Sequence, residues 1–263
     1  MNTNSIVEFW PKSLQKDLFQ KINSFNKYAL SGFANTSSKC FTLANFCKSN
    51  EIKNMFVMVN ANGDLNDHIN HLSLFSGLKI EELELEPNPH NDKFISKRNN
   101  LNLLNFASKI HQGNKAIFVS NYIDALSDAF DKTVFEKTLD FSKGSKLTNT
   151  QIFESLINAG YEIGDSIEVE QGQYYCRGDL IAIFPVNFDY PIRLHVEFDE
   201  ITSIEILSHD FNSVIGQLEE VSIYQIQKPN SYLKHVDWLN YGDTFQLPHW
   251  DPMSNYCSLL CCT

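Results

Sequence analysis

The chain has 263 residues, of which 32 are acidic and 21 are lysine or arginine, giving a formal net charge of −11. A chain of this length buries about three quarters of its surface on folding, so it needs no disulfide to hold it together. Its acidic balance opposes non-specific binding to a nucleic-acid backbone, although a local basic patch remains compatible with it.

The sequence carries no signal for secretion or for a membrane. No apolar run approaches the ~18 residues that a membrane span requires, and residues 1–7 contain neither a basic stretch nor a long apolar one. The six cysteines match no disulfide framework and no Cys-x-x-Cys metal pair. We therefore expect a protein of the reducing cytoplasm that contacts no membrane.

The first half of the sequence alternates between helical and strand patterns. The predicted helices and strands, in chain order, are 14–25, 28–30, 40–47, 55–59, 65–75, 79–85, 95–110, 116–119 and 123–130. The strands among them are 28–30, 55–59, 79–85 and 116–119. Because strands that alternate with helices build parallel sheets, residues 1–143 are predicted to form an α/β domain with a parallel, helix-covered sheet.

The second half has closely spaced strand patterns after one short helix. Thr148 followed by Gln151 is a capping-box signature, and Gly160 is placed to end that helix. The strands predicted after it are 167–170, 174–176, 180–184, 192–198 and 201–207. This spacing predicts a small antiparallel α+β domain over 144–228, and residues 229–263 are predicted to be an irregular C-terminal tail.

One of these strands alternates clearly between apolar and polar residues. The apolar positions, predicted to face the core, are Ile192, Leu194, Val196 and Phe198. Arg193, His195 and Glu197 then share the opposite face. This polar face is either a solvated surface with a cross-strand ion pair or a partner-binding face. The turn after the strand is predicted at Asp199 and Glu200.

A phosphate loop is the first nucleotide site to consider, because residues 32–40 follow a predicted strand and open a helix. Gly32, Ser38 and Lys39 are its candidate residues, but the second glycine and the Gly-Lys-Ser/Thr ending are missing. The alternative is an ordinary helix N-terminus, capped by Thr36 or Ser37 and with Lys39 on its surface. No acidic pair follows the 116–119 strand to hold Mg²⁺, so no cofactor and no NTP hydrolysis are predicted.

Other catalytic and metal-binding patterns are equally incomplete. The sequence contains no Gly-x-Ser-x-Gly elbow and no His-Glu-x-x-His helix. His68 and His71 share a helix face, a pattern more typical of exposed surface than of a metal site, and His90 with Asp92 has no further ligand. We therefore predict no metal and no enzymatic activity.

Five ordered landmarks with characteristic gaps occupy about 60 residues of the second half. They are Gly160-Tyr161 at a helix end, Arg177-Gly178-Asp179, Ile183-Phe184-Pro185, the strand with Arg193, and Asp199-Glu200-Ile201. In this order they resemble the UvrB interaction domain, the module shared by the excision-repair protein UvrB and the bacterial transcription-repair coupling factor, Mfd. Residues 89–126 resemble the first domain of the coupling factor. The incomplete phosphate loop at residues 32–40 also resembles the degenerate loop of that domain. The resemblance covers about residues 25–227.

The resemblance implies a non-catalytic, UvrB-like body that docks on the repair ATPase UvrA. In the family, the UvrA-facing surface lies around the Arg-Gly turn and the arginine-bearing strand. By position this surface corresponds to Tyr175, Arg177, Asp179, Arg193, His195 and Glu197. Tyr175 and His195 stand where UvrB usually has an arginine and a glutamate. Two alternatives stay open: an accessory DNA-binding protein that uses Lys97 and Arg98, and a coupling-factor fragment without activity of its own.

Overall fold

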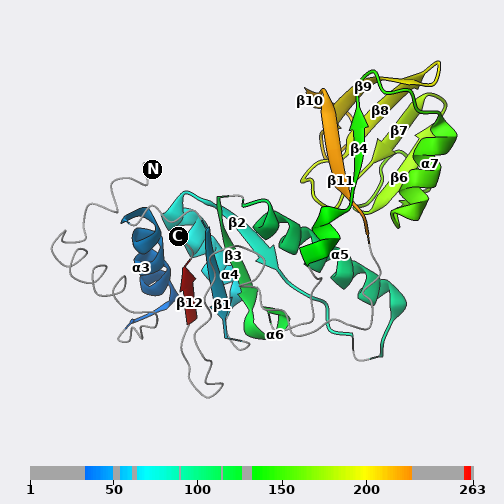
Figure 1. The fold of residues 1–263 in the computed structure, drawn as a ribbon. Coiled ribbons are helices and arrows are strands. Elements are labelled where there is room, and N and C mark those ends of the chain that lie inside the picture. The colour runs from blue at the N-terminus through cyan, green and yellow to red at the C-terminus, as the bar shows by residue number, and fades with distance from the viewer. Residues whose placement is uncertain are drawn as a thin grey trace. The chain divides into compact units, whose positions relative to one another are not determined.

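The computed structural model describes residues 33–49, 54–60, 64–88, 90–113, 115–125, 132–226 and 258–261 (Figure 1). It divides into two compact units. The first comprises the described parts of Met1–Leu85, Gln112–Ser127 and Asp237–Thr263, and the second those of Glu86–His111 and Asp128–Val236. No helix in these described parts is long and apolar enough to cross a membrane. Gly32 and the strand predicted at 28–30 lie outside the described residues.

The first unit is built on a four-stranded sheet with the strand order β12-β1-β3-β2. Its strands are β1 (Asn54–Val59), β2 (Lys79–Leu83), β3 (Ala116–Asn121) and β12 (Ser258–Cys261). The first three are parallel, which confirms the prediction of a parallel sheet, whereas β12 pairs antiparallel with β1. Residues 258–261, within the tail predicted to be irregular, thus form an edge strand.

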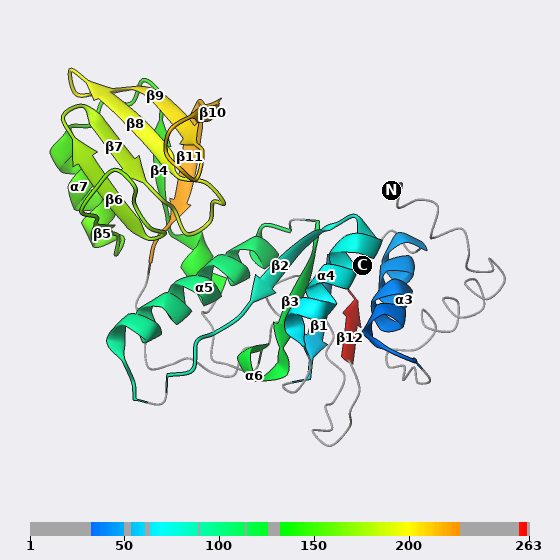
Figure 2. The ribbon, with the colours of Figure 1, turned by 180° about the vertical axis from the view of Figure 1, so that it is seen from behind.

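Two helices cover one face of this sheet (Figure 2). They are α3 (Thr36–Ser49) and α4 (Leu65–Ser76), which pack on each other and on apolar side chains of β1 and β3. Their shared core includes Cys40, Phe46, Val57, Leu72 and Ile117. The single turn α6 (Tyr122–Ala125) follows β3. Continuous apolar runs in β1 and β3 are expected for parallel strands that are buried on both faces.

The second unit contains a six-stranded sheet with the order β10-β9-β8-β7-β6-β5. Its strands are β5 (Glu162–Ile163), β6 (Gln173–Arg177), β7 (Leu180–Ile183), β8 (Ile192–Glu197), β9 (Glu200–Leu207) and β10 (Val214–Leu218). All neighbouring strands are antiparallel except β5 and β6. A separate antiparallel pair joins β4 (Thr138–Ser142) to β11 (Glu220–Tyr224).

One face of the six-stranded sheet packs on α7 (Asn149–Asn158) and on the β4–β11 pair. Ile152 and Leu156 of α7 are fully buried against sheet residues such as Ile181 and Leu194. The predicted capping box at the start of α7 is confirmed. Gly160 follows the last helical residues with a φ of 87°, the left-handed conformation expected of a helix-ending glycine.

The helix α5 (Lys93–His111) contacts one end of this six-stranded sheet. Lys97 forms an ion pair with Glu162 at the start of β5, and Lys109 Nζ lies 2.9 Å from Asp189 Oδ1 in the β7–β8 loop. His111 stacks on Phe135 of the 3₁₀ helix η1 (Lys132–Glu136). The turns after β6 and β8 lie at the other end of the sheet, because antiparallel strands alternate in direction.

Several predicted boundaries are wrong. Residues 167–170 form no strand, although Val169 is buried, and the short β5 precedes them. Alternating apolar residues report burial, but a strand also requires a partner, and this stretch has none among the described residues. The prediction also missed β10, which pairs with the preceding β9, and the β4–β11 pair, whose two strands are distant in sequence. The described end of the predicted 123–130 helix is Ala125.

Gly160→Ala is expected to destabilise the second unit by at least about 2 kcal/mol. A Cβ here would lie 2.2 Å from the carbonyl oxygen of Ile226, and the left-handed backbone alone costs about 1–2 kcal/mol for an L-residue. Denaturant unfolding of the full chain measures the loss. Gly144→Ala is the matched control, because Gly144 has a φ of 84° and open space around it. Equal losses in the two variants would contradict the steric explanation.

Candidate partner-binding face

The strand register brings the predicted partner-binding residues onto one face of the six-stranded sheet. Two rows of paired residues run across β6, β7, β8 and β9. The first consists, in this strand order, of Tyr175, Ala182, Arg193 and Glu205, and the next of Arg177, Leu180, His195 and Ser203. Because side chains alternate along a strand, these rows lie opposite the apolar face that packs on α7. We call them the outer face of the sheet.

Arg177 lies at the edge of the outer face, next to a tight hairpin turn. It pairs with Leu180, so that Gly178 and Asp179 are the only two residues of the β6–β7 loop. Gly178 has a φ of 62°, and a positive φ at the first central residue alone is the type II′ pattern that requires glycine. Arg177 is exposed and forms no ion pair with any other described residue. Its guanidinium is therefore available to a partner.

Arg193 differs, because it is already paired within the chain. Its Nε and Nη2 donate to the Glu205 Oε2 at 2.9 and 2.6 Å, and the Nε2 of His195 lies 3.0 Å from the same oxygen. The three side chains are only 14 to 27% exposed. The polar face thus does contain a cross-strand ion pair, between Arg193 and Glu205.

Arg193 and His195 change the titration of Glu205. Partial burial raises its pKa, but hydrogen bonds and positive charge from Arg193 and His195 outweigh burial and hold the pKa below the ordinary value. Glu205 is a residue of this face that was not predicted from the sequence. It faces the same way as Arg193 only in the observed register, which includes an irregularity between His195 and Val196 that no local pattern announces.

The predicted end of β8 is wrong by one residue. Glu197 pairs with Glu200, so the turn consists of Phe198 and Asp199, not of Asp199 and Glu200. Phe198 was expected to continue the apolar face of the strand, but it is fully exposed at the tip of the turn. Glu197 and Asp179 are exposed beside the two turns, at the same end of the sheet.

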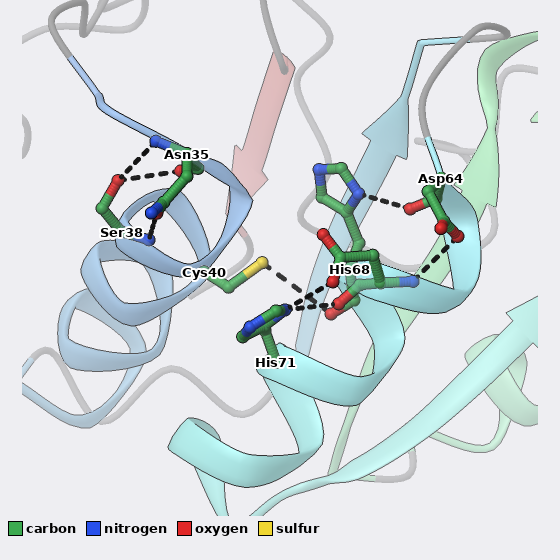
Figure 3. Close-up of polar contacts among 7 residues, drawn as sticks. Asn35, Ser38, Cys40, Asp64, His68 and His71 are labelled. Carbon is green, nitrogen blue, oxygen red and sulfur yellow. Dashed lines mark hydrogen bonds and ion pairs between the residues drawn. The ribbon is translucent and has the colours of Figure 1, made fainter.

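The candidate nucleotide segment begins α3 with a closed cap (Figure 3). The amide of Ser38 donates to Asn35 Oδ1 at 2.9 Å, and Ser38 Oγ donates to the Asn35 carbonyl at 2.8 Å. Asn35 is therefore the cap, and the prediction of Thr36 or Ser37 is wrong. Lys39 is half-buried. A phosphate site at Ser38 and Lys39 stays a prediction, and Gly32 is not described.

The histidine pair on α4 is held within its own helix, as Figure 3 shows. His68 Nδ1 lies 2.8 Å from the Asp64 carbonyl oxygen, and His71 Nδ1 lies 2.8 Å from that of Asp67. The expectation of an exposed pair is wrong for His68, which is buried, while His71 is half-buried. No group of three potential metal ligands occurs among the described residues, His90 and Asp92 included.

The basic residues proposed for DNA contact are both paired with acids. Lys97 forms an ion pair with Glu162, and Arg98 forms one with Glu86. Ion pairs reduce the positive charge that a phosphate backbone would meet, so these two residues supply little of the attraction that DNA binding requires.

Comparison with known proteins gives a family match to the second unit. Residues 139–228 match the family described as the UvrB interaction domain. The UvrABC system protein B of Methanothermobacter thermautotrophicus is 36% identical over 89 residues, which cover 34% of this chain and 14% of that protein. The transcription-repair-coupling factor of Escherichia coli is 31% identical over 85 residues, covering 32% and 7%.

A further relative extends the likeness. The UvrABC system protein B of Streptococcus agalactiae is 24% identical over 143 residues, covering 52% of this chain and 21% of that protein. That match is longer than the stretch from Leu139 to Thr263, so it includes residues before the matched domain. The chain thus spans only about a fifth or less of the length of these relatives.

Glu205→Gln is expected to lower the unfolding free energy at pH 7 by about 1.5–3 kcal/mol, the usual contribution of hydrogen bonds to a charged group. Because the folded-state pKa is lowered, the charged carboxylate stabilises the fold above the unfolded value of about 4.3. That contribution disappears as the pH falls through the folded pKa. Urea unfolding of both proteins between pH 3 and 7 measures the difference.

Glu219→Gln is the matched control, since Glu219 is 82% exposed and pairs with the exposed Lys143 at 3.3 Å. Such a surface pair contributes about 0–1 kcal/mol. A loss for Glu205→Gln no larger than this control, or a loss that persists unchanged at pH 3, would contradict the stabilising role of the Arg193–Glu205 pair.

Proposed function

We propose that this chain acts in nucleotide excision or transcription-coupled repair, because residues 139–228 match the UvrB interaction domain and are similar to segments of a UvrABC system protein B and of a transcription-repair-coupling factor. In this process the chain acts as a cytoplasmic interaction module that docks onto a UvrA-type ATPase. The docking surface is the outer face of the sheet, with Arg177 as its principal charge. The observation that carries the proposal is that Arg177 is exposed on this face and forms no ion pair with another described residue.

Arg177 and Arg193 differ in their contacts within the chain, and this difference supports Arg177 as the principal charge of the docking surface. Arg177 is exposed at the edge of the outer face and has no intrachain ion pair among the described residues. A guanidinium can donate two parallel hydrogen bonds to a partner carboxylate, which gives orientation as well as energy. Arg193 already shares Glu205 with His195, so it holds the face in shape and offers a partner only its remaining donors.

Tyr175 and His195 shape the rest of the outer face. Tyr175 pairs with Ala182 of β7, which pairs in turn with Arg193, so Tyr175 and Arg193 lie in the same row. Both the ring and the hydroxyl of Tyr175 suit a contact with another protein. His195 hydrogen bonds Glu205 where a relative would carry a glutamate. The face therefore presents an aromatic residue and an internally neutralised cluster, with most of its unneutralised positive charge at Arg177.

We also propose that the chain catalyses no reaction. The N-terminus of α3 is closed by Asn35 and Ser38, whose hydrogen bonds use the Ser38 amide. Asp124, the acid after β3, accepts from the Leu85 amide at 3.0 Å and from Asn121, so it joins the ends of β2 and β3. Equilibrium dialysis with ATP and Mg²⁺ is expected to show no retention, and saturable retention would contradict this part of the proposal.

Arg177→Ala is expected to cost about 2–5 kcal/mol of binding free energy for UvrA, the usual range for truncating one member of a desolvated charge pair. Isothermal titration calorimetry of the full chain with UvrA from the same organism measures it. The fold should not change, because the Arg177 side chain makes no described intrachain ion pair. Arg98→Ala is the matched control, since Arg98 is exposed and pairs with Glu86 on another part of the unit.

Two results would refute the proposal. The first is the absence of saturable binding by the intact chain, which would mean that the partner is not UvrA. The second is unchanged affinity of Arg177→Ala, which would place the docking surface elsewhere. Salt-sensitive binding of duplex DNA that is lost in a Lys97→Ala, Arg98→Ala double variant would favour the DNA-binding alternative.

A further inference from the structure

Phe198 is the most exposed large apolar residue among the described residues. Its relative exposure is 102%, so its ring contacts almost nothing in the described chain. It stands at the tip of the two-residue β8–β9 turn, between the paired residues Glu197 and Glu200. A phenylalanine in this position adds nothing to the packing of the core.

The backbone at this turn is also unfavourable for phenylalanine. Phe198 has a φ of 52° and Asp199 a φ of 62°. Positive φ at both central residues is the type I′ pattern, which favours asparagine, aspartate and glycine. A bulky residue at positive φ is a conformational outlier, and such outliers persist where the surrounding strands fix the backbone. Phe198 therefore reduces the stability of the fold while exposing an aromatic ring.

The neighbours of Phe198 are mostly acidic. Glu197 and Asp199 adjoin it in sequence, Glu200 follows Asp199, and all three are exposed. Asp179, at the tip of the adjacent hairpin, accepts a hydrogen bond through its carbonyl from the Val196 amide at 2.8 Å, so the β6–β7 turn lies beside this one. Cations at this end include Arg177 in β6 and Lys146, whose backbone bridges to Glu200.

This end of the sheet is also accessible within its unit. The ion pairs that join α5 to the sheet are with Glu162 and Asp189, at the end where β5 and β8 begin. The turns at Gly178 and Phe198 lie at the opposite end. They adjoin the proposed docking surface, because Arg177 immediately precedes the first of them.

We propose that Phe198 is an anchor residue for the UvrA-type partner, seated in an apolar pocket that lysine or arginine side chains border. This inference rests on the proposed function and extends the docking surface from the outer face onto the turn end of the sheet. Aromatic side chains that fill a pocket dominate many interfaces, and the surrounding acids match a basic rim. Arg177, which lies beside these acids, contacts a carboxylate of the same partner. Because acidic and basic groups then alternate along the docking surface, their charges set the orientation of the partner.

Phe198→Gly is the most informative variant, because the two effects of Phe198 predict opposite changes. Glycine relaxes the left-handed turn, so the Tm of the full chain should rise by about 2–4 °C. Loss of the ring should weaken binding to UvrA by about tenfold or more in calorimetry. Phe94→Ala, which removes an 81%-exposed phenylalanine from the first turn of α5, is the control and should leave the affinity unchanged.

Asp199→Asn tests the charge of the rim. Asparagine tolerates the left-handed backbone and keeps the size of the side chain, so only one charge is removed. Binding to UvrA should weaken about two- to fivefold at low salt and should match that of the intact chain at about 1 M salt, where screening is strong. An unchanged affinity at low salt would remove the basic rim from the proposal.

The outcomes separate this inference from the proposed function. If the intact chain binds UvrA and Phe198→Gly binds as tightly, the anchor is refuted and the docking function stands. If the intact chain does not bind UvrA, both fall together. If Phe198→Gly changes only the self-association of the chain in sedimentation velocity, the turn belongs to a contact between two copies, and the anchor is refuted.

Discussion

The packing of one face of the six-stranded sheet against α7 and the β4–β11 pair is the constraint on which the second unit depends. Residues such as Ile152, Leu156, Ile181 and Leu194 are fully buried there. Since successive side chains of a strand point to opposite faces, burying these residues forces their neighbours onto the outer face. The position of Arg193 and His195 on the outer face is thus a direct consequence of the core.

Electrostatics within the chain then decide what the outer face offers. Glu205 accepts from both Arg193 and His195, and these contacts hold its pKa below the ordinary value. Arg177, at the edge of the sheet, has no such partner among the described residues. Two arginines that look equivalent in the sequence therefore differ in what they can give to another protein.

The turn end of the sheet combines two features that do not stabilise the fold. Phe198 is fully exposed and occupies a left-handed backbone conformation, and exposed carboxylates flank it. Contact with an apolar pocket bordered by basic side chains would bury the exposed ring and offset the repulsion between the carboxylates. Relief on binding is a physical reason to place the anchor of the docking surface here and not on the flat centre of the sheet.

The sequence by itself determined the elements whose signals are local. The capping box at Thr148, the glycine that ends α7 and the buried runs of β1 and β3 follow from side-chain chemistry and spacing within a few residues. The landmarks around Arg177 and Arg193 likewise identified the domain that residues 139–228 match.

Only the tertiary structure decided which residues meet across distance. The pairing of β12 with β1 and of β4 with β11 joins segments far apart in the chain. Glu205 meets Arg193 across the β8–β9 hairpin, in a register that depends on packing and on an irregularity. The turn at Phe198 was misplaced for the same reason. Apolar alternation predicts an inward side chain, whereas the pairing of Glu197 with Glu200 ends the strand one residue earlier.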